Sequence, residues 1–137
     1  MLNLPNSLDR TRGPAKGNVT VPKVMIVDDD RSMVRLLQTL LTLDGFLVVH
    51  ESRAAEILNA IRAEKPDVVM MDKNLGGVDG LELLKQIRAD VDLHQLPVVI
   101  ASGEDVAYKC RELGANDFVL KPYSPDELTK ILKKVIR

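Results

Sequence analysis

Short apolar runs alternate along the chain with longer segments in which apolar residues recur every three to four positions. The short runs contain few polar residues, which is typical of parallel strands covered on both faces. The longer segments have the period of amphipathic helices. The pattern predicts strands over residues 23–27, 46–50, 67–71, 97–101 and 117–120, and helices over residues 31–43, 53–63, 80–89, 104–113 and 125–136.

Turn and cap residues support several of these boundaries. Gly45, Pro66 and Gly114 each follow a predicted helix as a stop signal. The last helix opens on SPDE at residues 124–127, which has the spacing of a capping box with proline at the first helical position. Strands that alternate with helices in this way predict an α/β fold, a doubly wound five-stranded parallel sheet with five helices.

The composition fits one soluble globular domain. The chain has 137 residues, 45% of them hydrophobic, and a net charge of −1. No apolar run is long enough to span a bilayer and no signal peptide is visible, so we expect a cytoplasmic location and no membrane insertion. Cys110 is the single cysteine, which excludes an intramolecular disulfide and a cysteine-cluster metal site. Without tryptophan or a basic footprint, we expect no nucleic-acid binding.

Residues 1–22 differ in character from the rest of the chain. They are rich in glycine, proline and asparagine and show no helical or strand period. We predict a flexible N-terminal tail over residues 1–22 and one domain over residues 23–137. The tail is mildly basic, so docking to a partner or a membrane surface is the alternative to a solvated tail.

Polar side chains stand at the ends of four predicted strands. The first, third, fourth and fifth strands run into Asp28 and Asp29, Asp72, Ser102 and Lys121, respectively. The second strand, which ends near His50 and Glu51, offers nothing obvious. Ligands of open α/β sheets bind beyond the carboxyl ends of the strands, so we expect these side chains to form one site.

The chemistry of these residues points to a metal and a phosphoryl group. Carboxylates crowded at two strand ends repel one another, and a hard divalent cation such as Mg²⁺ offsets that repulsion. Lys121 and Ser102 supply a positive charge and a hydroxyl donor for phosphoryl oxygens. An aspartate beside such a cation can be a nucleophile toward phosphorus. Asp72 is the best candidate because Asp28 and Asp29 sit together whereas Asp72 stands alone on its strand.

Each of these residues also has an ordinary structural interpretation. An aspartate after a strand is often a helix N-cap, and we predict that role for Asp30. Ser102 could cap the fourth helix, and a lysine before proline is usually solvated. The presence of such polar residues at four strand ends of one sheet favours a functional site.

Four features of the sequence together resemble the receiver domain of two-component response regulators. They are the acid pair after the first strand, the segment MMDKNLGGVDGLELL around Asp72, Ser102 after the fourth strand, and the KP pair at Lys121 after the fifth. The resemblance covers residues 23–137 and implies the flavodoxin-like strand order 2-1-3-4-5.

This resemblance implies a role for each site residue. Asp72 would accept a phosphoryl group from the phosphohistidine of a histidine kinase or phosphotransfer protein, and Lys121 would pair with that group. Mg²⁺ would be the cofactor, bound by Asp29, Asp72 and the carbonyl of Asn74, with Asp28 acting through water.

The resemblance also implies how the signal would leave the site. Ser102 would turn toward the phosphoryl group and Phe118 would change rotamer in step, altering the face formed by the fourth helix, fifth strand and fifth helix. A downstream protein partner or a second copy of the chain would bind that face. Asn74 and Glu104 would border the path of the hydrolytic water and set the lifetime of the phosphoryl group, which we expect to be short.

The chain departs from the usual receiver pattern at two glycines. Gly76 stands where proline is usual, which predicts a more mobile loop, and Gly103 replaces a commoner alanine. These changes bear on loop rigidity and partner choice rather than on the chemistry.

Three other interpretations remain. A Mg²⁺-dependent phosphohydrolase would need a general acid near Asp72 and usually a cap domain, but the second residue on is Asn74 and no insertion is long enough. A scaffold that keeps the fold without taking phosphate is disfavoured because all the chemical residues are present. No output domain is visible, and the sequence does not exclude that the domain belongs to a longer protein. The remaining reactive residues, Cys110, His50 and His94, are interpreted as packing or surface residues.

Overall fold

The computed structural model describes residues 21–136 and contains a five-stranded parallel sheet. Its order is β2-β1-β3-β6-β7. The strands are β1 (Lys23–Val27), β2 (Leu47–Glu51), β3 (Val68–Asp72), β6 (Val98–Ser102) and β7 (Asp117–Leu120). Counted along the chain, these five strands have the order 2-1-3-4-5, so the predicted doubly wound α/β fold is confirmed.

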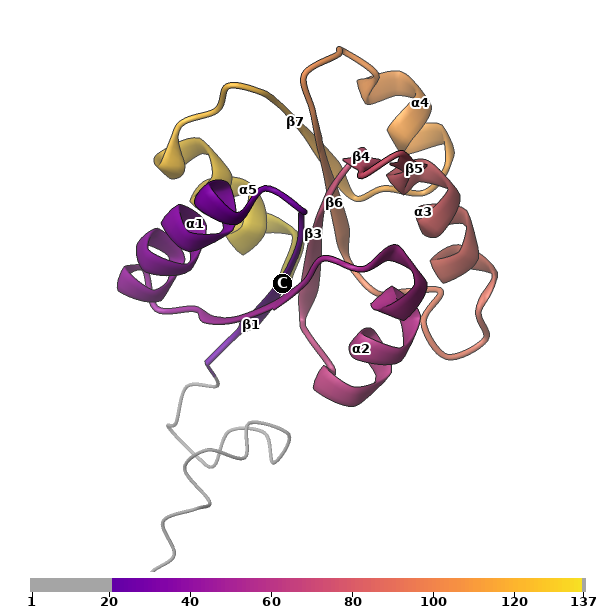
Figure 1. Cartoon of the computed structure of the whole chain (residues 1–137), viewed down its shortest axis with the longest axis horizontal. Coiled ribbons are helices and arrows are strands. Elements are labelled where there is room, and N and C mark those ends of the chain that lie inside the picture. The colour runs from indigo at the N-terminus through magenta and orange to yellow at the C-terminus, as the bar shows by residue number, and fades with distance from the viewer. Residues whose placement is uncertain (1–20, 137) are drawn as a thin grey trace, which may run out of the picture.

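Helices cover both faces of the sheet (Figure 1). One face carries α1 (Arg31–Leu43) and α5 (Pro125–Ile136), and the other carries α2 (Ile57–Glu64), α3 (Gly80–Ala89) and α4 (Ala107–Glu112). A short 3-10 turn, η3 (Ala54–Glu56), leads into α2. The three central strands β1, β3 and β6 are therefore buried on both sides, which is why their sequences are nearly continuous apolar runs, whereas the edge strands β2 and β7 are partly exposed.

The side chains of each strand alternate between two hydrophobic cores. In β1, Val24 and Ile26 pack in the core under α1 and α5, whereas Met25 and Val27 pack in the core under α2 and α3. Cys110 of α4 is fully buried in the second of these cores, so its interpretation as a packing residue is confirmed.

Most element boundaries agree with the sequence prediction to within one residue. The bounds of β1, β7, α1, α3 and α5 are as predicted, whereas β2, β3 and β6 each begin and end one residue later. The helix predicted over residues 53–63 is wrong at its start, because η3 occupies its first turn and α2 begins only at Ile57. The apolar Phe46 is buried, but its N–H donates back to the carbonyl of Leu41 at the end of α1, so β2 begins only at Leu47. Asp30 caps α1 as predicted, accepting from the N–H groups of Ser32 and Met33.

The fourth helix is shorter than the predicted 104–113 and begins only at Ala107. Local side-chain hydrogen bonds compete with the helix there: Ser102 Oγ accepts from the Glu104 N–H at 3.0 Å, and Asp105 accepts from the Ala107 N–H at 3.4 Å. The N-cap residue is Val106, without a side-chain cap. The interpretation of Ser102 as a cap for this helix is therefore wrong.

A small antiparallel hairpin, β4 (Asn74–Leu75) and β5 (Val78–Asp79), follows β3 and was not predicted. Gly76 and Gly77 form its turn with φ values of +55° and +92°. Proline, whose φ is fixed near about −65°, does not fit that conformation at Gly76. The two glycines thus meet the demand of a turn with positive φ at both central residues, and the greater mobility expected of this loop stays a prediction.

The predicted tail falls almost entirely on residues 1–20, which lie outside the described residues. Over residues 21–136, no helix is both long enough and apolar enough to cross a membrane.

Candidate functional site

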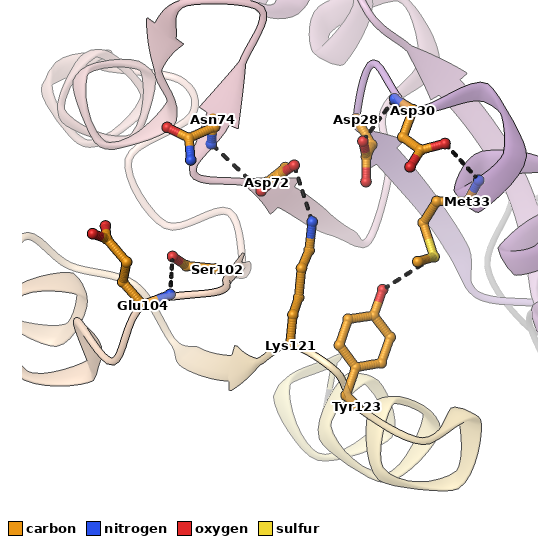
Figure 2. A network of polar contacts seen from close by, with 9 residues as sticks. All are labelled: Asp28, Asp30, Met33, Asp72, Asn74, Ser102, Glu104, Lys121 and Tyr123. Carbon is orange, nitrogen blue, oxygen red and sulfur yellow. Dashed lines mark hydrogen bonds and ion pairs between the residues drawn. The ribbon is translucent and has the colours of Figure 1, made fainter.

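The polar residues predicted at the strand ends meet at one edge of the sheet. Figure 2 shows Asp28 and Lys121 directed toward Asp72, with Ser102 beside them on the neighbouring strand. Asp72 and Ser102 are the last residues of β3 and β6, and these two strands pair directly. The common location follows from the parallel sheet, which brings the carboxyl ends of its strands to the same edge.

Three carboxylates form an acidic cluster at this edge. Asp28, Asp29 and Asp72 each place one oxygen within 4.8 Å of the others. Asp28 is only 3% exposed, and its Oδ1 accepts from the Asp30 N–H at 2.9 Å. Burial raises the pKa of Asp28, and the Asp72 carboxylate raises it further, while the Asp30 N–H opposes the shift. A cation would relieve this repulsion, and oxygen ligands of this type are those that Mg²⁺ prefers.

The ammonium group of Lys121 places a positive charge next to the acidic cluster. Its Nζ donates to Asp72 Oδ2 at 3.1 Å (Figure 2). The Asn74 N–H lies 3.4 Å from the other oxygen, Oδ1. Asp72 therefore lies between an ammonium group, which attracts an anionic substrate group, and two carboxylates, whose repulsion of that group a divalent cation would offset.

A backbone hydrogen bond joins Ser102 and Lys121. The Lys121 N–H donates to the Ser102 carbonyl at 2.8 Å. Ser102 is 1% exposed, and its Oγ accepts from Glu104, which leaves the hydroxyl hydrogen for another acceptor. Phe118, opposite Ile100 in the β6–β7 pairing, is partly buried against the core under α2, α3 and α4.

Asn74 and Glu104 lie at the solvent side of the site. Both are exposed, Asn74 in β4 and Glu104 in the loop between β6 and α4. Figure 2 shows them on the same side of Asp72.

Sequence reasoning missed two contributions to the site. The second strand does reach it: His50 Nε2 lies 3.0 Å from the carbonyl oxygen of Asp28, which requires a proton on that nitrogen. Gly80 was also missed, although a Cβ at this position would lie only 2.4 Å from the carbonyl oxygen of Asp72. The glycine in the sequence VDG was the available signal, but only the fold reveals that the Asp72 backbone lies against it.

The sequence of residues 24–133 matches the family model of the response regulator receiver domain. The chain belongs to this family. The resemblance inferred from the four motifs is thereby confirmed. This receiver is a signalling domain of the two-component type, a family whose members work with histidine kinases and generally bind Mg²⁺.

Two relatives of this receiver are about twice its length. A probable transcriptional regulator ycf27 of Guillardia theta is 40% identical over 121 residues, covering 86% of this chain and 46% of its own length. The alkaline phosphatase synthesis transcriptional regulatory protein PhoP of Bacillus subtilis is 35% identical, covering 84% of this chain and 48% of its own. The chain thus spans about half the length of these relatives.

Two solved structures match this receiver over nearly their whole length. A putative response regulator of Chloroflexus aurantiacus has a TM-score of 0.78 at 31% identity, covering 84% of this chain and 97% of that one. The chemotaxis response regulator CheY4 of Vibrio cholerae has a TM-score of 0.77 at 27% identity, covering 85% and 99%, respectively.

Proposed function

We propose that this receiver accepts a phosphoryl group on Asp72 from the phosphohistidine of a kinase or phosphotransfer protein, in a Mg²⁺-dependent reaction. One observation carries the proposal: the Asp72 carboxylate lies 3.1 Å from Lys121 Nζ and within 4.8 Å of the Asp28 and Asp29 carboxylates. The Asp72 carboxylate thus has an ammonium group on one side and, on the other, a pair of carboxylates that could bind a metal ion.

In the proposed reaction, an oxygen of Asp72 attacks the phosphorus in line with the bond to the donor nitrogen. The new P–O bond forms as the P–N bond breaks, and the imidazole nitrogen keeps the electron pair. Lys121 exchanges part of its contact with Asp72 for the phosphoryl oxygens. Asp29, Asp72 and the Asn74 carbonyl would hold Mg²⁺, with Asp28 acting through water; the ion supplies positive charge that offsets the negative charge gathering at the site.

The proposed output is a change in the face formed by α4, β7 and α5. Ser102 would turn its hydroxyl to the phosphoryl group, and Phe118 would repack in step. Asp117 supports this proposal because it joins the three elements: its Oδ1 lies 3.2 Å from Arg111 of α4 and its Oδ2 lies 3.0 Å from Lys134 of α5. Exposed apolar side chains on two of these elements, Tyr108 and Leu120, offer contacts to a protein partner or a second copy.

The named relatives are transcriptional regulators, and this chain spans about half their length. A role in transcription would be exercised through a partner or through a further part of a longer protein. That the domain itself binds neither nucleic acid nor membrane, and that it is cytoplasmic, stay predictions of the sequence.

Incubation with acetyl phosphate and Mg²⁺ should add one phosphoryl group per chain, measured by intact mass. Chelation of Mg²⁺ should prevent the addition. Asp29→Ala removes a proposed metal ligand but leaves Asp72. The Mg²⁺ concentration for half-maximal labelling should therefore rise by about tenfold or more. An unchanged Mg²⁺ requirement would assign the ligand role elsewhere, and a wild type without label would contradict the proposed function.

The phosphoryl group should be lost quickly and more slowly after Asn74→Arg. Hydrolysis needs a water in line with the bond to Asp72, and neither Asn74 nor Glu104 is bulky enough to seal that path. A long basic side chain at position 74 would cover the phosphoryl oxygens. The measurement is the phosphoprotein remaining over time after desalting into Mg²⁺ buffer. A wild type that keeps its phosphate for many hours, with Asn74→Arg no slower, would refute the prediction.

A further inference from the structure

An ion pair between Lys73 and Glu104 lies at the rim of the site, and the proposed reaction assigns it no role. Lys73, directly after Asp72, places its Nζ 3.9 Å from Glu104 Oε1, two residues past Ser102. The side chain of Lys73 is 18% exposed whereas that of Glu104 is 74% exposed. The Lys73 side chain is therefore largely enclosed, whereas the exposed Glu104 side chain has more freedom to move.

The backbones of both residues are fixed next to the reacting groups. The Lys73 N–H donates to the Ala101 carbonyl at 2.9 Å, and the Lys73 carbonyl accepts from Gly80. The Glu104 N–H donates to Ser102 Oγ at 3.0 Å, and Figure 2 shows the Glu104 carboxylate turned away from Lys121. With its backbone tied to Ser102, the Glu104 side chain can either remain with Lys73 or swing across the opening of the site.

The charge balance makes that choice consequential. Three carboxylates already face one ammonium group at the centre of the site. A phosphodonor is an anion, so a fourth carboxylate swinging over the opening would repel it, and by an amount that falls as salt rises.

We propose that Lys73 is a positioning residue for phosphoryl uptake: it binds Glu104 at the rim and keeps that carboxylate off the path of anionic donors to Asp72. The role rests on the proposed function, since it concerns access to Asp72. It gives Lys73 and Glu104 a joint effect on uptake, separate from any effect of Glu104 on hydrolysis.

The test is a double-mutant cycle on the rate of labelling by acetyl phosphate at low salt, with Lys73→Met, Glu104→Gln and both together. Methionine keeps the length of the buried stem without the charge. Lys73→Met should slow labelling by about twofold to fivefold more in the wild-type background than in the Glu104→Gln background, the size typical of an exposed ion pair. Lys73→Arg should restore the rate, and about 1 M salt should remove most of the difference.

Equal slowing by Lys73→Met in both backgrounds would overturn the role, because the lysine would then act as an isolated charge or through packing. Since Glu104 is exposed, its variant tests the pair without disturbing the fold: if the salt dependence of labelling is the same in the wild type and in Glu104→Gln, the role is also overturned. A wild type that takes no phosphoryl group overturns the proposed function with it, whereas a labelled wild type with additive variants overturns only the role of Lys73.

Discussion

Replacement of Asp72 by asparagine should abolish labelling by acetyl phosphate. The substitution keeps the size of the side chain and an oxygen that can accept from Lys121, whose Nζ lies 3.1 Å from Asp72 Oδ2. It removes the anionic oxygen that would attack phosphorus, and a neutral amide is not a nucleophile of that kind. Intact mass after incubation with acetyl phosphate and Mg²⁺ should show one added phosphoryl group in the wild type and none in Asp72→Asn.

Asp90→Asn is a matched control for this experiment. Asp90 also pairs with a cation, Arg62, and its Oδ1 accepts from the Asp92 N–H at 2.8 Å, which an asparagine oxygen can replace. It follows the last residue of α3, whereas Asp72 lies against the first residue, Gly80, so the control is about 15 Å away along the helix. Asp90→Asn should be labelled like the wild type. If Asp72→Asn still gained a phosphoryl group, the nucleophile would have to be reassigned to Asp28 or Asp29.

Replacement of Gly80 by alanine should both destabilise the fold and slow the labelling of Asp72. In an ordinary helix, glycine to alanine is favourable by about 1 kcal/mol. Here the new Cβ would lie 2.4 Å from the Asp72 carbonyl oxygen and 3.2 Å from Lys73 Cα, both backbone atoms that can move only together with β3. We expect a loss of about 1–3 kcal/mol in the free energy of unfolding, the usual cost of overpacking, with displacement of the nucleophile.

Gly103→Ala is the control for Gly80→Ala, because a Cβ at Gly103 would meet nothing within 4 Å and its φ is not positive. This variant should keep the wild-type free energy of unfolding or gain about 0.4–1 kcal/mol through a less flexible unfolded chain. Denaturant midpoints and labelling rates of both variants check the prediction. A Gly80→Ala protein with the stability and labelling rate of the wild type would show that the Asp72 backbone tolerates the shift.

Much of the fold and of the central site could be predicted from the sequence. The central strands β1, β3 and β6 are buried on both faces, so they are visible as continuous apolar runs, and the long helices α1, α3 and α5 show the helical period of three to four residues. Parallel strands end at a common edge, so reading one residue past each run was enough to bring together Asp28, Asp72 and Lys121.

The limits of α4 and the β4–β5 hairpin could not be predicted from these patterns. Periodicity reports which residues are buried, not whether a backbone N–H is bonded within a helix or to a side chain. The Glu104 N–H is bonded to Ser102 Oγ, so α4 begins later than its apolar pattern suggests. The hairpin has only two residues in each strand, too few for an alternation of apolar and polar residues to be recognised.

What the sequence determined by itself was the order of strands and helices, the identity of the family and the set of groups at the sheet edge, because these depend on local patterns and on motif spacing. What only the tertiary structure decided was how those groups are supported: Gly80 against the Asp72 backbone, His50 against Asp28, and Lys73 against Glu104. These contacts join residues on different elements at close range. Their existence depends on packing distances that no single segment of the sequence encodes.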